Sequence, residues 1–328
     1  MERPFGEIPP EAQPLETPEE SHAVKRFVRM SPETAMDNDD EYAELFACQE
    51  ELPDELEKTP EQRRVIEKIL AALPAFVARY GGRALPLRPE HVHLFAHEKD
   101  VGTEYFGGAQ RTHVAVRPGG RGSRNRFTAD VIHELLHFNA FQSLEESAGR
   151  EVSFRRGGLN VRVGGADVGT WLDEAMTEEL TKRLFREREH DDAACWEEAE
   201  EARRLGRNFM LPGDPPEDEI LGFEEPDSTD PSPTFMPFQY RQERRRLNEV
   251  LDGIVAESPD KFPDREAVFD VFARAYFSGN LLEIARMVER TYGRGAFRTM
   301  MEGRQMLPEP LYMQKQRQER RNRGNAGA

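Results

Sequence analysis

The segment VIHELLHF, residues 131 to 138, constrains this chain more than any other stretch of its sequence. Apolar residues recur through it and beyond it at helical spacing, so we predict a helix over roughly residues 128 to 146 with a broad apolar surface. Four residues turn a helix by about 400°, which places His133 and His137 on the same face, one turn apart. The fold must therefore present two neighbouring imidazoles from one largely apolar helix.

Two imidazoles in this arrangement can bind a single metal ion. Zinc favours nitrogen ligands, and a catalytic zinc site has three protein ligands and one open position. Glu134 follows His133 at about 100° around the helix, where its carboxylate can accept a proton from a water on the metal. We therefore expect zinc (Zn2+) on His133 and His137, with Glu134 as general base. The alternative is a helix with two hydrogen-bonded histidines, but the chain has only 8 histidines and the pattern rarely arises by chance.

With these residues in place, the sequence resembles the zincin metallopeptidases. Metzincins, one branch, carry Gly and His three and six residues after the second histidine. Ala140 and Ser143 stand at those positions, so that branch is excluded. The stretch WLDEAMTEEL, residues 171 to 180, is similar to the W-L-N-E-G segment that opens the next ligand-bearing helix in aminopeptidase-type gluzincins. This resemblance implies that Glu174 is the third zinc ligand.

The resemblance also implies a role for Glu178, one turn after Glu174. In thermolysin-like gluzincins an acidic residue at that offset orients the first histidine ligand through a hydrogen bond to its other nitrogen. Glu174 follows His137 by 37 residues (174 − 137), about twice the familiar spacing, and a hairpin predicted at 151 to 165 accounts for the insertion. Asp173 is the rival ligand, although Glu174 and Glu178 share a helix face that Asp173 does not.

Hydrolysis also needs a donor for the developing oxyanion. Tyr240 is the first choice, because it follows a long loop and precedes a run of arginines; Tyr276 is the second, and Tyr292 also lies downstream. The alternative for each is a core tyrosine with a satisfied hydroxyl. The zincin resemblance further implies an edge strand that pairs with a peptide substrate; residues 112 to 116, THVAV, are the candidate, or else an ordinary core strand. Four further histidines give no closed ligand set, and we take them as structural or surface residues: 91, 93, 97 and 113.

Charge and composition exclude several other classes of protein. The formal net charge is −17 and the isoelectric point about 5.1, which disfavours nucleic-acid binding because phosphates attract basic surfaces. Two cysteines are too few for a disulfide framework. No signal peptide and no membrane-spanning run are evident, so we expect a cytoplasmic protein. The expected partner is a peptide or protein substrate, with the oligomeric state left open.

The distribution of apolar residues predicts an α+β fold with a small mixed N-terminal sheet, a helix carrying the motif and a helical C-terminal subdomain. The resemblance implies that this fold is zincin-like and that the motif helix is the active-site helix. The chain divides into five expected segments: a mostly disordered acidic, proline-rich tail (1–56), the zincin subdomain (57–211), an acidic, proline-rich loop (212–238), the helical subdomain (239–313) and a disordered basic tail (314–328). The expected function is zinc-dependent hydrolysis of a peptide bond. The alternative is a zincin-like binding or regulatory module with little or no hydrolysis.

Overall fold

The computed structural model describes residues 56–94, 102–105, 112–116, 124–146, 152–163, 166–189, 193–209, 216–224, 234–303 and 307–326. The α-helices within these ranges are α4 (Pro60–Arg79), α5 (Arg124–Asn139), α6 (Thr170–Arg188), α7 (Ala193–Phe209), α8 (Arg241–Glu257), α9 (Arg265–Ser278), α10 (Leu282–Tyr292), α11 (Ala296–Glu302) and α12 (Leu311–Ala326). Short 3₁₀ turns lie at Pro89–His91 and Glu217–Glu219.

The strands form three small sheets. Strands β1 (Val92–Leu94), β2 (Gly102–Tyr105) and β3 (Thr112–Val116) make a mixed sheet in the order β1-β3-β2, in which β3 is parallel to β1 and antiparallel to β2. Four antiparallel strands form the second sheet: β4 (Gln142–Glu146), β5 (Val152–Gly157), β6 (Asn160–Val163) and β7 (Ala166–Val168). Strands β8 (Ile220–Glu224) and β9 (Thr234–Pro237) form a two-stranded ribbon. The mixture of helices and strands confirms the α+β class and the mixed N-terminal sheet.

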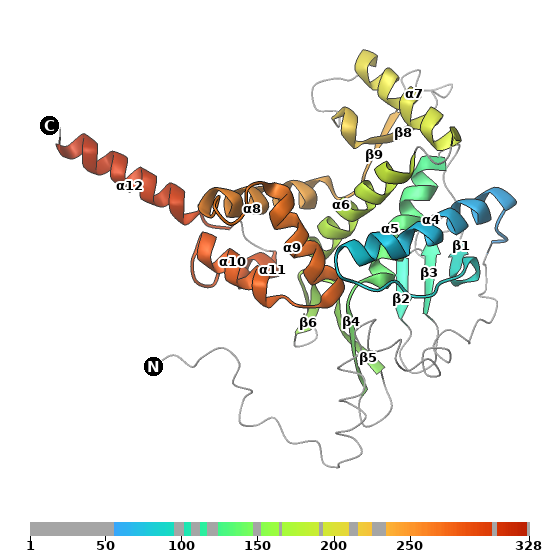
Figure 1. The fold of residues 1–328 in the computed structure, drawn as a ribbon, viewed down its shortest axis with the longest axis horizontal. Coiled ribbons are helices and arrows are strands. Elements are labelled where there is room, and N and C mark those ends of the chain that lie inside the picture. Colours follow the sequence, from blue (N-terminus) through green and yellow to red (C-terminus); the bar gives the residue numbers. More distant parts are fainter. Residues whose placement is uncertain are drawn as a thin grey trace, which may run out of the picture.

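Helices α5 and α6 lie side by side in the middle of the molecule (Figure 1). Helix α4 and the sheet β1–β3 lie at one end, and helices α8 to α11 lie at the other, with α12 extending away from them. Helix α4 begins as its sequence predicts. Thr59 and Gln62 form a reciprocal capping box, and Pro60 occupies the first helical position, where its missing N–H costs nothing.

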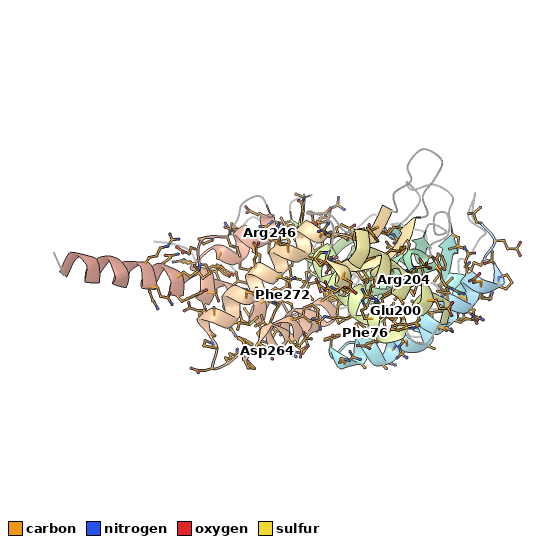
Figure 2. All side chains as sticks on the ribbon, turned by 90° about the horizontal axis from the view of Figure 1, so that it is seen from above. Phe76, Glu200, Arg204, Arg246, Asp264 and Phe272 are labelled. Carbon is orange, nitrogen blue, oxygen red and sulfur yellow. The ribbon has the colours of Figure 1, made fainter. Side chains whose placement is uncertain are left out.

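One continuous cluster of buried apolar side chains joins these helices. The ring of Tyr80, just after α4, stacks on Phe277 of α9 with centroids 6.2 Å apart, and Phe76 packs edge-on against Tyr80. Phe76 of α4 and Phe272 of α9 are both fully buried (Figure 2). The central pair α5 and α6 is therefore held from both sides, and this fixes the side chains that project between them.

Two predictions about the motif helix and its neighbouring strand are wrong in detail. Helix α5 ends at Asn139, and residues 142 to 146 form β4, which pairs with β5. The helix ends there because the Asn139 amide binds Leu135 O and accepts the N–H of Leu85, while Phe141 N donates to Tyr276 O outside the helix. The strand at 112 to 116 is not an edge: β3 is the central strand, because β2 pairs with its free side.

The structure also corrects the expected loop and tail. Within the stretch predicted as a loop, residues 212 to 238, strands β8 and β9 form a ribbon whose strand β8 packs against α7, and the buried residue Phe238 follows directly after β9. Helix α7 itself was not predicted. The C-terminal tail, predicted to be disordered, forms α12, because its Gln, Arg, Lys and Glu residues are good helix formers. The predictions for residues 1 to 55, and for the histidine at position 97, lie outside the described residues.

Four of the helices and one hairpin lie where the sequence pattern predicts them. Helices α6, α8, α9 and α10 lie where their apolar periodicity predicts them. The hairpin predicted at 151 to 165 is β5–β6, with Gly157 paired to Asn160 across a two-residue turn. No helix among the described residues combines the length and apolar composition needed to span a membrane.

Candidate metal centre

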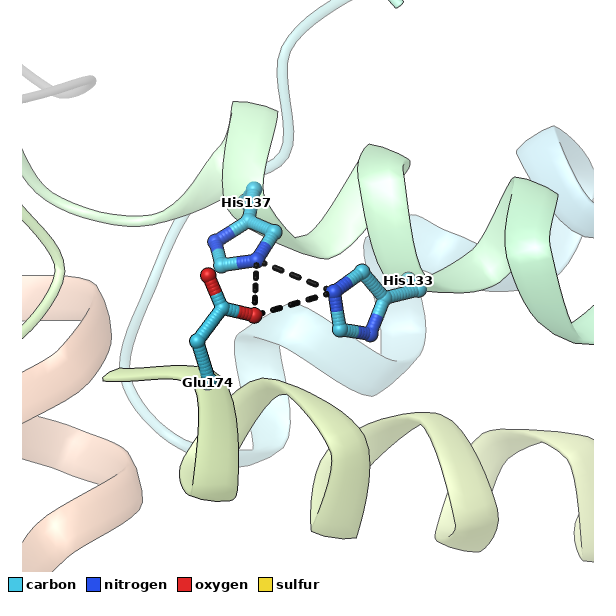
Figure 3. Close-up of side chains that lie close together, drawn as sticks. All are labelled: His133, His137 and Glu174. Atoms are coloured by element: carbon cyan, nitrogen blue, oxygen red, sulfur yellow. Dashed lines mark hydrogen bonds and ion pairs between the residues drawn. The ribbon is translucent and has the colours of Figure 1, made fainter. Parts of the chain in front are cut away.

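The candidate ligands come from the two central helices. On α5 the apolar residues Ile132, Leu135 and Leu136 are fully buried, so the helix is held with His133 and His137 directed towards α6 (Figure 3). Helix α6 begins after Gly169, whose φ of 92° lies in the left-handed region that glycine tolerates. Glu174 therefore lies near the beginning of α6, opposite the last two turns of α5.

The three ligand atoms form a small triangle. The Nε2 atoms of His133 and His137 are 3.1 Å apart, and Glu174 Oε2 lies 3.4 Å from the first and 3.3 Å from the second (Figure 3). The His133 side chain is 6% exposed, whereas those of His137 and Glu174 are 17% and 23% exposed. The site is therefore closed at His133 and partly open to solvent at His137 and Glu174.

A carboxylate fixes the far nitrogen of the first imidazole. Nδ1 of His133 lies 2.7 Å from Glu178 Oε2, and the Glu178 side chain is 2% exposed. The second Glu178 oxygen accepts the backbone N–H of Gln239 at 2.5 Å. Because both oxygens are engaged, Glu178 holds His133 with Nε2 towards Glu174, which is the position expected for Glu178.

The second imidazole has a similar support. Asp173 Oδ2 lies 3.3 Å from Nδ1 of His137, and Thr177 Oγ1 lies 3.4 Å from the same nitrogen. The Thr177 hydroxyl also bonds the Tyr276 hydroxyl at 2.8 Å. Asp173 therefore contacts the nitrogen on the far side of the ring from the triangle, and Glu174 rather than Asp173 lies with the two histidines in the candidate ligand set. The sequence did not predict this contact between Asp173 and His137. The one sequence feature that pointed to it is the position of Asp173, directly before Glu174 and one helical turn before Thr177.

The site favours positive charge at the two imidazoles. Burial alone lowers the pKa of His133, but its hydrogen bonds with Glu174 and Glu178 outweigh burial and raise the pKa to about 9. For His137 the pKa is also raised, because Asp173 and Glu174 outweigh burial. Burial raises the pKa of Glu174, yet the two histidines lower it below its usual range. Two imidazolium charges equal the charge of one divalent cation, so such a cation can replace the two protons without changing the local net charge.

Two of the proposed tyrosines lie near the site in different ways. The Tyr240 ring stacks on His133 with centroids 5.6 Å apart and an angle of 11° between the planes. Burial raises the pKa of Tyr240, and the carboxylates of Glu174 and Glu134 raise it further, so its hydroxyl stays protonated. Tyr276 is fully buried and bonds Thr177, which places it behind His137.

Tyr292 takes no part in the centre. Its hydroxyl donates to backbone carbonyls of α8, at 3.1 Å from Val250 O. Glu134 is half-buried, and its charge raises the pKa of both Tyr240 and Tyr276, so it borders the same space. The structure thus brings together His133, His137, Glu174, Glu178, Glu134 and Tyr240 and leaves Tyr292 elsewhere.

A buried arginine that the sequence did not single out supports Tyr240. Arg244 has a side chain only 4% exposed, paired with Glu219 and, at 3.3 Å, with Glu179. Its Nε donates to Gln239 O at 3.0 Å. The peptide groups of Gln239 are therefore fixed by Arg244 on one side and by Glu178 on the other. The run of arginines at 244 to 246 gave no sign of which one would be buried.

Comparison with known proteins leaves the family undecided. No known protein family matches the chain, and no curated protein or solved structure shows significant similarity to it. The chemistry of this centre must therefore be argued from its own residues.

Proposed function

We propose that this protein is a zinc-dependent peptide-bond hydrolase with a gluzincin-type site in a zincin-like fold. The observation that carries the proposal is the triangle of His133 Nε2, His137 Nε2 and Glu174 Oε2, whose ligand atoms lie within 4.8 Å of one another. Each imidazole also has a carboxylate at its other nitrogen, from Glu178 and Asp173. Such partners fix the orientation of a histidine ligand and make it a stronger donor.

The dimensions of the triangle suit zinc. In a tetrahedral site with bonds of about 2.0–2.1 Å, neighbouring ligand atoms lie roughly 3.3–3.4 Å apart. The three distances here are 3.1, 3.3 and 3.4 Å. Two imidazole nitrogens and one carboxylate oxygen are a ligand set that zinc accepts, and three protein ligands leave one position for chemistry.

The surrounding residues can carry out amide hydrolysis. Zinc held by His133, His137 and Glu174 would supply the Lewis acidity needed to activate water and polarise a substrate carbonyl. Glu134 takes the proton from the attacking water and can deliver it to the leaving amine. The Tyr240 hydroxyl, kept protonated beside His133, can donate to the carbonyl oxygen as negative charge develops there. The partly exposed side of His137 and Glu174 gives a peptide access to the site.

The alternative is a binding or regulatory module built on the same fold. Glu134 favours hydrolysis over this alternative, because a module that only binds has no chemical need for a general base beside the ligands. One variant therefore separates the two functions.

The test pairs metal content with peptide turnover. The purified full chain should take up about one zinc and cleave members of a mixed peptide library, with products read by mass spectrometry. Glu134→Gln should keep the zinc and lose about 10²–10⁴-fold in turnover. His133→Ala should lose both metal and turnover.

Either of two results would overturn the proposal. A parent protein that takes up no zinc when zinc is added would remove the metal centre. A Glu134→Gln protein with the turnover of the parent would remove the general-base role of Glu134.

A further inference from the structure

The hairpin β5–β6 lies between His137 and Glu174, which are 37 positions apart (174 − 137), and its tip contacts the candidate metal centre. Gly158 N donates to Phe141 O at 2.6 Å, which ties the tip to the chain just after α5. Leu159 follows and is fully buried. The backbone N–H of Leu159 donates to Asp173 Oδ1 at 2.7 Å. The tip is therefore bonded to both ligand-bearing segments.

Asp173 connects this tip to the second imidazole. While Oδ1 accepts the N–H of Leu159, Oδ2 faces Nδ1 of His137 at 3.3 Å. The Asp173 side chain is only 10% exposed, so water competes little for either contact. A bond from rigid backbone to one oxygen limits the rotation of the carboxylate, and this fixes the other oxygen against His137.

Gly158 leaves the room that Asp173 needs. Its φ is +53°, in the left-handed region that side chains rarely adopt. A Cβ at this position would lie 2.2 Å from Asp173 Oδ1 and 2.8 Å from Tyr276 Cε2. Any other residue here would therefore push the Asp173 carboxylate away from its observed place. Glycine at this turn therefore both allows the left-handed backbone conformation and leaves space for the Asp173 carboxylate.

We propose that the tip of the β5–β6 hairpin is a positioning element for the metal centre. Gly158 and the N–H of Leu159 set the place of Asp173, and Asp173 sets the orientation of His137. The inference rests on the metal site of the proposed function, but it concerns metal affinity and does not depend on hydrolysis. Zinc affinity should then respond to a change in the hairpin that touches no ligand.

The test measures zinc affinity by competition with a chelating dye, using the full chain. Gly158→Ala and Asp173→Ala should each weaken affinity by about 10–100-fold, the usual effect of losing a partner of a ligand. The double variant should bind zinc no more weakly than Asp173→Ala, because the added methyl then meets no Asp173 oxygen. Such non-additivity is expected of residues that act through one another.

Gly253→Ala is the matched control. Gly253 lies in α8, and a Cβ there would be 2.0 Å from Tyr292 Oη, so the substitution is also crowded. It lies 13 residues along the helix from Tyr240 (253 − 240), a distance of roughly 20 Å at 1.5 Å per residue. This variant should lose stability, followed by thermal unfolding without metal, and keep the zinc affinity of the parent.

Several outcomes would overturn the inference. Parental affinity in folded Gly158→Ala would do so, and so would an equal loss in Gly158→Ala and Gly253→Ala, since that effect would be general destabilisation. If Gly158→Ala does not fold, parental affinity in Asp173→Ala is sufficient to reject the inference. In all of these cases a parent that binds zinc leaves the proposed function standing. A parent that binds no zinc rejects the proposed function and the inference together.

Discussion

At the scale of single residues, Tyr240 shows what the sequence could and could not predict. The sequence offered Tyr240, Tyr276 and Tyr292 as donors, and only the fold separates them. Tyr240 is the one non-glycine residue with positive φ, at 50°, among the described residues. This conformation is costly for a bulky side chain and persists only where neighbouring contacts hold it. Glu178 and Arg244 hold the preceding residue, Gln239, from both sides.

Tyr240→Phe should lower kcat while leaving zinc content unchanged. Removing one oxyanion donor reduces kcat by about 10²–10³-fold, and the phenylalanine ring can still stack on His133. Steady-state kinetics on a peptide cleaved by the parent, with metal analysis of the same samples, measure both quantities. Tyr292→Phe is the control, because its hydroxyl bonds only the α8 backbone and its loss should affect stability alone. If the Tyr240→Phe protein keeps the kcat of the parent, the Tyr240 hydroxyl is not the donor to the oxyanion.

Arg244 supports a second prediction at this scale. Removing it leaves Glu179 without the cation it pairs with and leaves Glu219 with Lys182 alone, at 2.5 Å, so the loss should be about 3 kcal/mol of unfolding free energy, at the low end of the range for a broken buried pair. Arg265 pairs with Asp252 at 2.7 Å, yet both side chains are about half exposed, and Arg265→Ala should cost about 0–1 kcal/mol. Urea unfolding of Arg244→Ala and Arg265→Ala compares the two pairs. Equal losses would mean that the buried pair contributes no more than the exposed one.

At the scale of elements, apolar periodicity predicted the positions of several helices but not where α5 ends. Helices α8 and α10 bury one face each, so the spacing of their apolar residues can be recognised in the sequence, whereas α6 and α9 bury side chains around most of the helix. The end of α5 could not be predicted from the sequence, because apolar residues continue at helical spacing through Phe141 and Leu144. There the choice between helix and strand depends on the partner strand β5, which is distant in sequence. Likewise β2 and β9 gain their backbone partners only in the folded chain.

Asn139 should be the residue that fixes the end of α5. Its amide oxygen accepts the N–H of Leu85 at 2.7 Å, and its nitrogen donates to Leu135 O at 2.7 Å, with the side chain 1% exposed. Asn139→Ala strands the Leu85 N–H in the core and should cost about 1–3 kcal/mol in urea unfolding. The exposed Asn280→Ala, whose side chain accepts from Leu282 N at 3.3 Å, should cost about 0.5 kcal/mol or less. A loss in Asn139→Ala no larger than this would show that α5 ends for other reasons.

At the scale of the whole molecule, the candidate centre was more predictable than the fold around it. Helical geometry alone requires His133 and His137 to share a face, wherever the helix lies. Glu174 followed from the resemblance of the stretch at 171 to 180 to a short gluzincin segment, and Glu178 from its offset of one turn; the structure places both beside the histidines. The hairpin between His137 and Glu174 could be predicted as an insertion, but its contact with Asp173 could not, since that contact depends on where the turn packs in the folded chain.

The position of the centre predicts how zinc should affect the stability of the entire chain. Its ligands join α5 to α6, and these helices share one apolar core with α4 and with α8 to α11. A ligand that binds only the folded state stabilises it by mass action, by about 2.7 kcal/mol when its concentration is 100 times Kd. For a chain of this size the gain corresponds to a rise in Tm on the order of 4 °C. Differential scanning calorimetry should show one transition that rises with zinc and returns to the metal-free value with a chelator. The same titration of His137→Ala should leave Tm nearly constant. An equal rise in that variant would mean that zinc stabilises the protein through some other site.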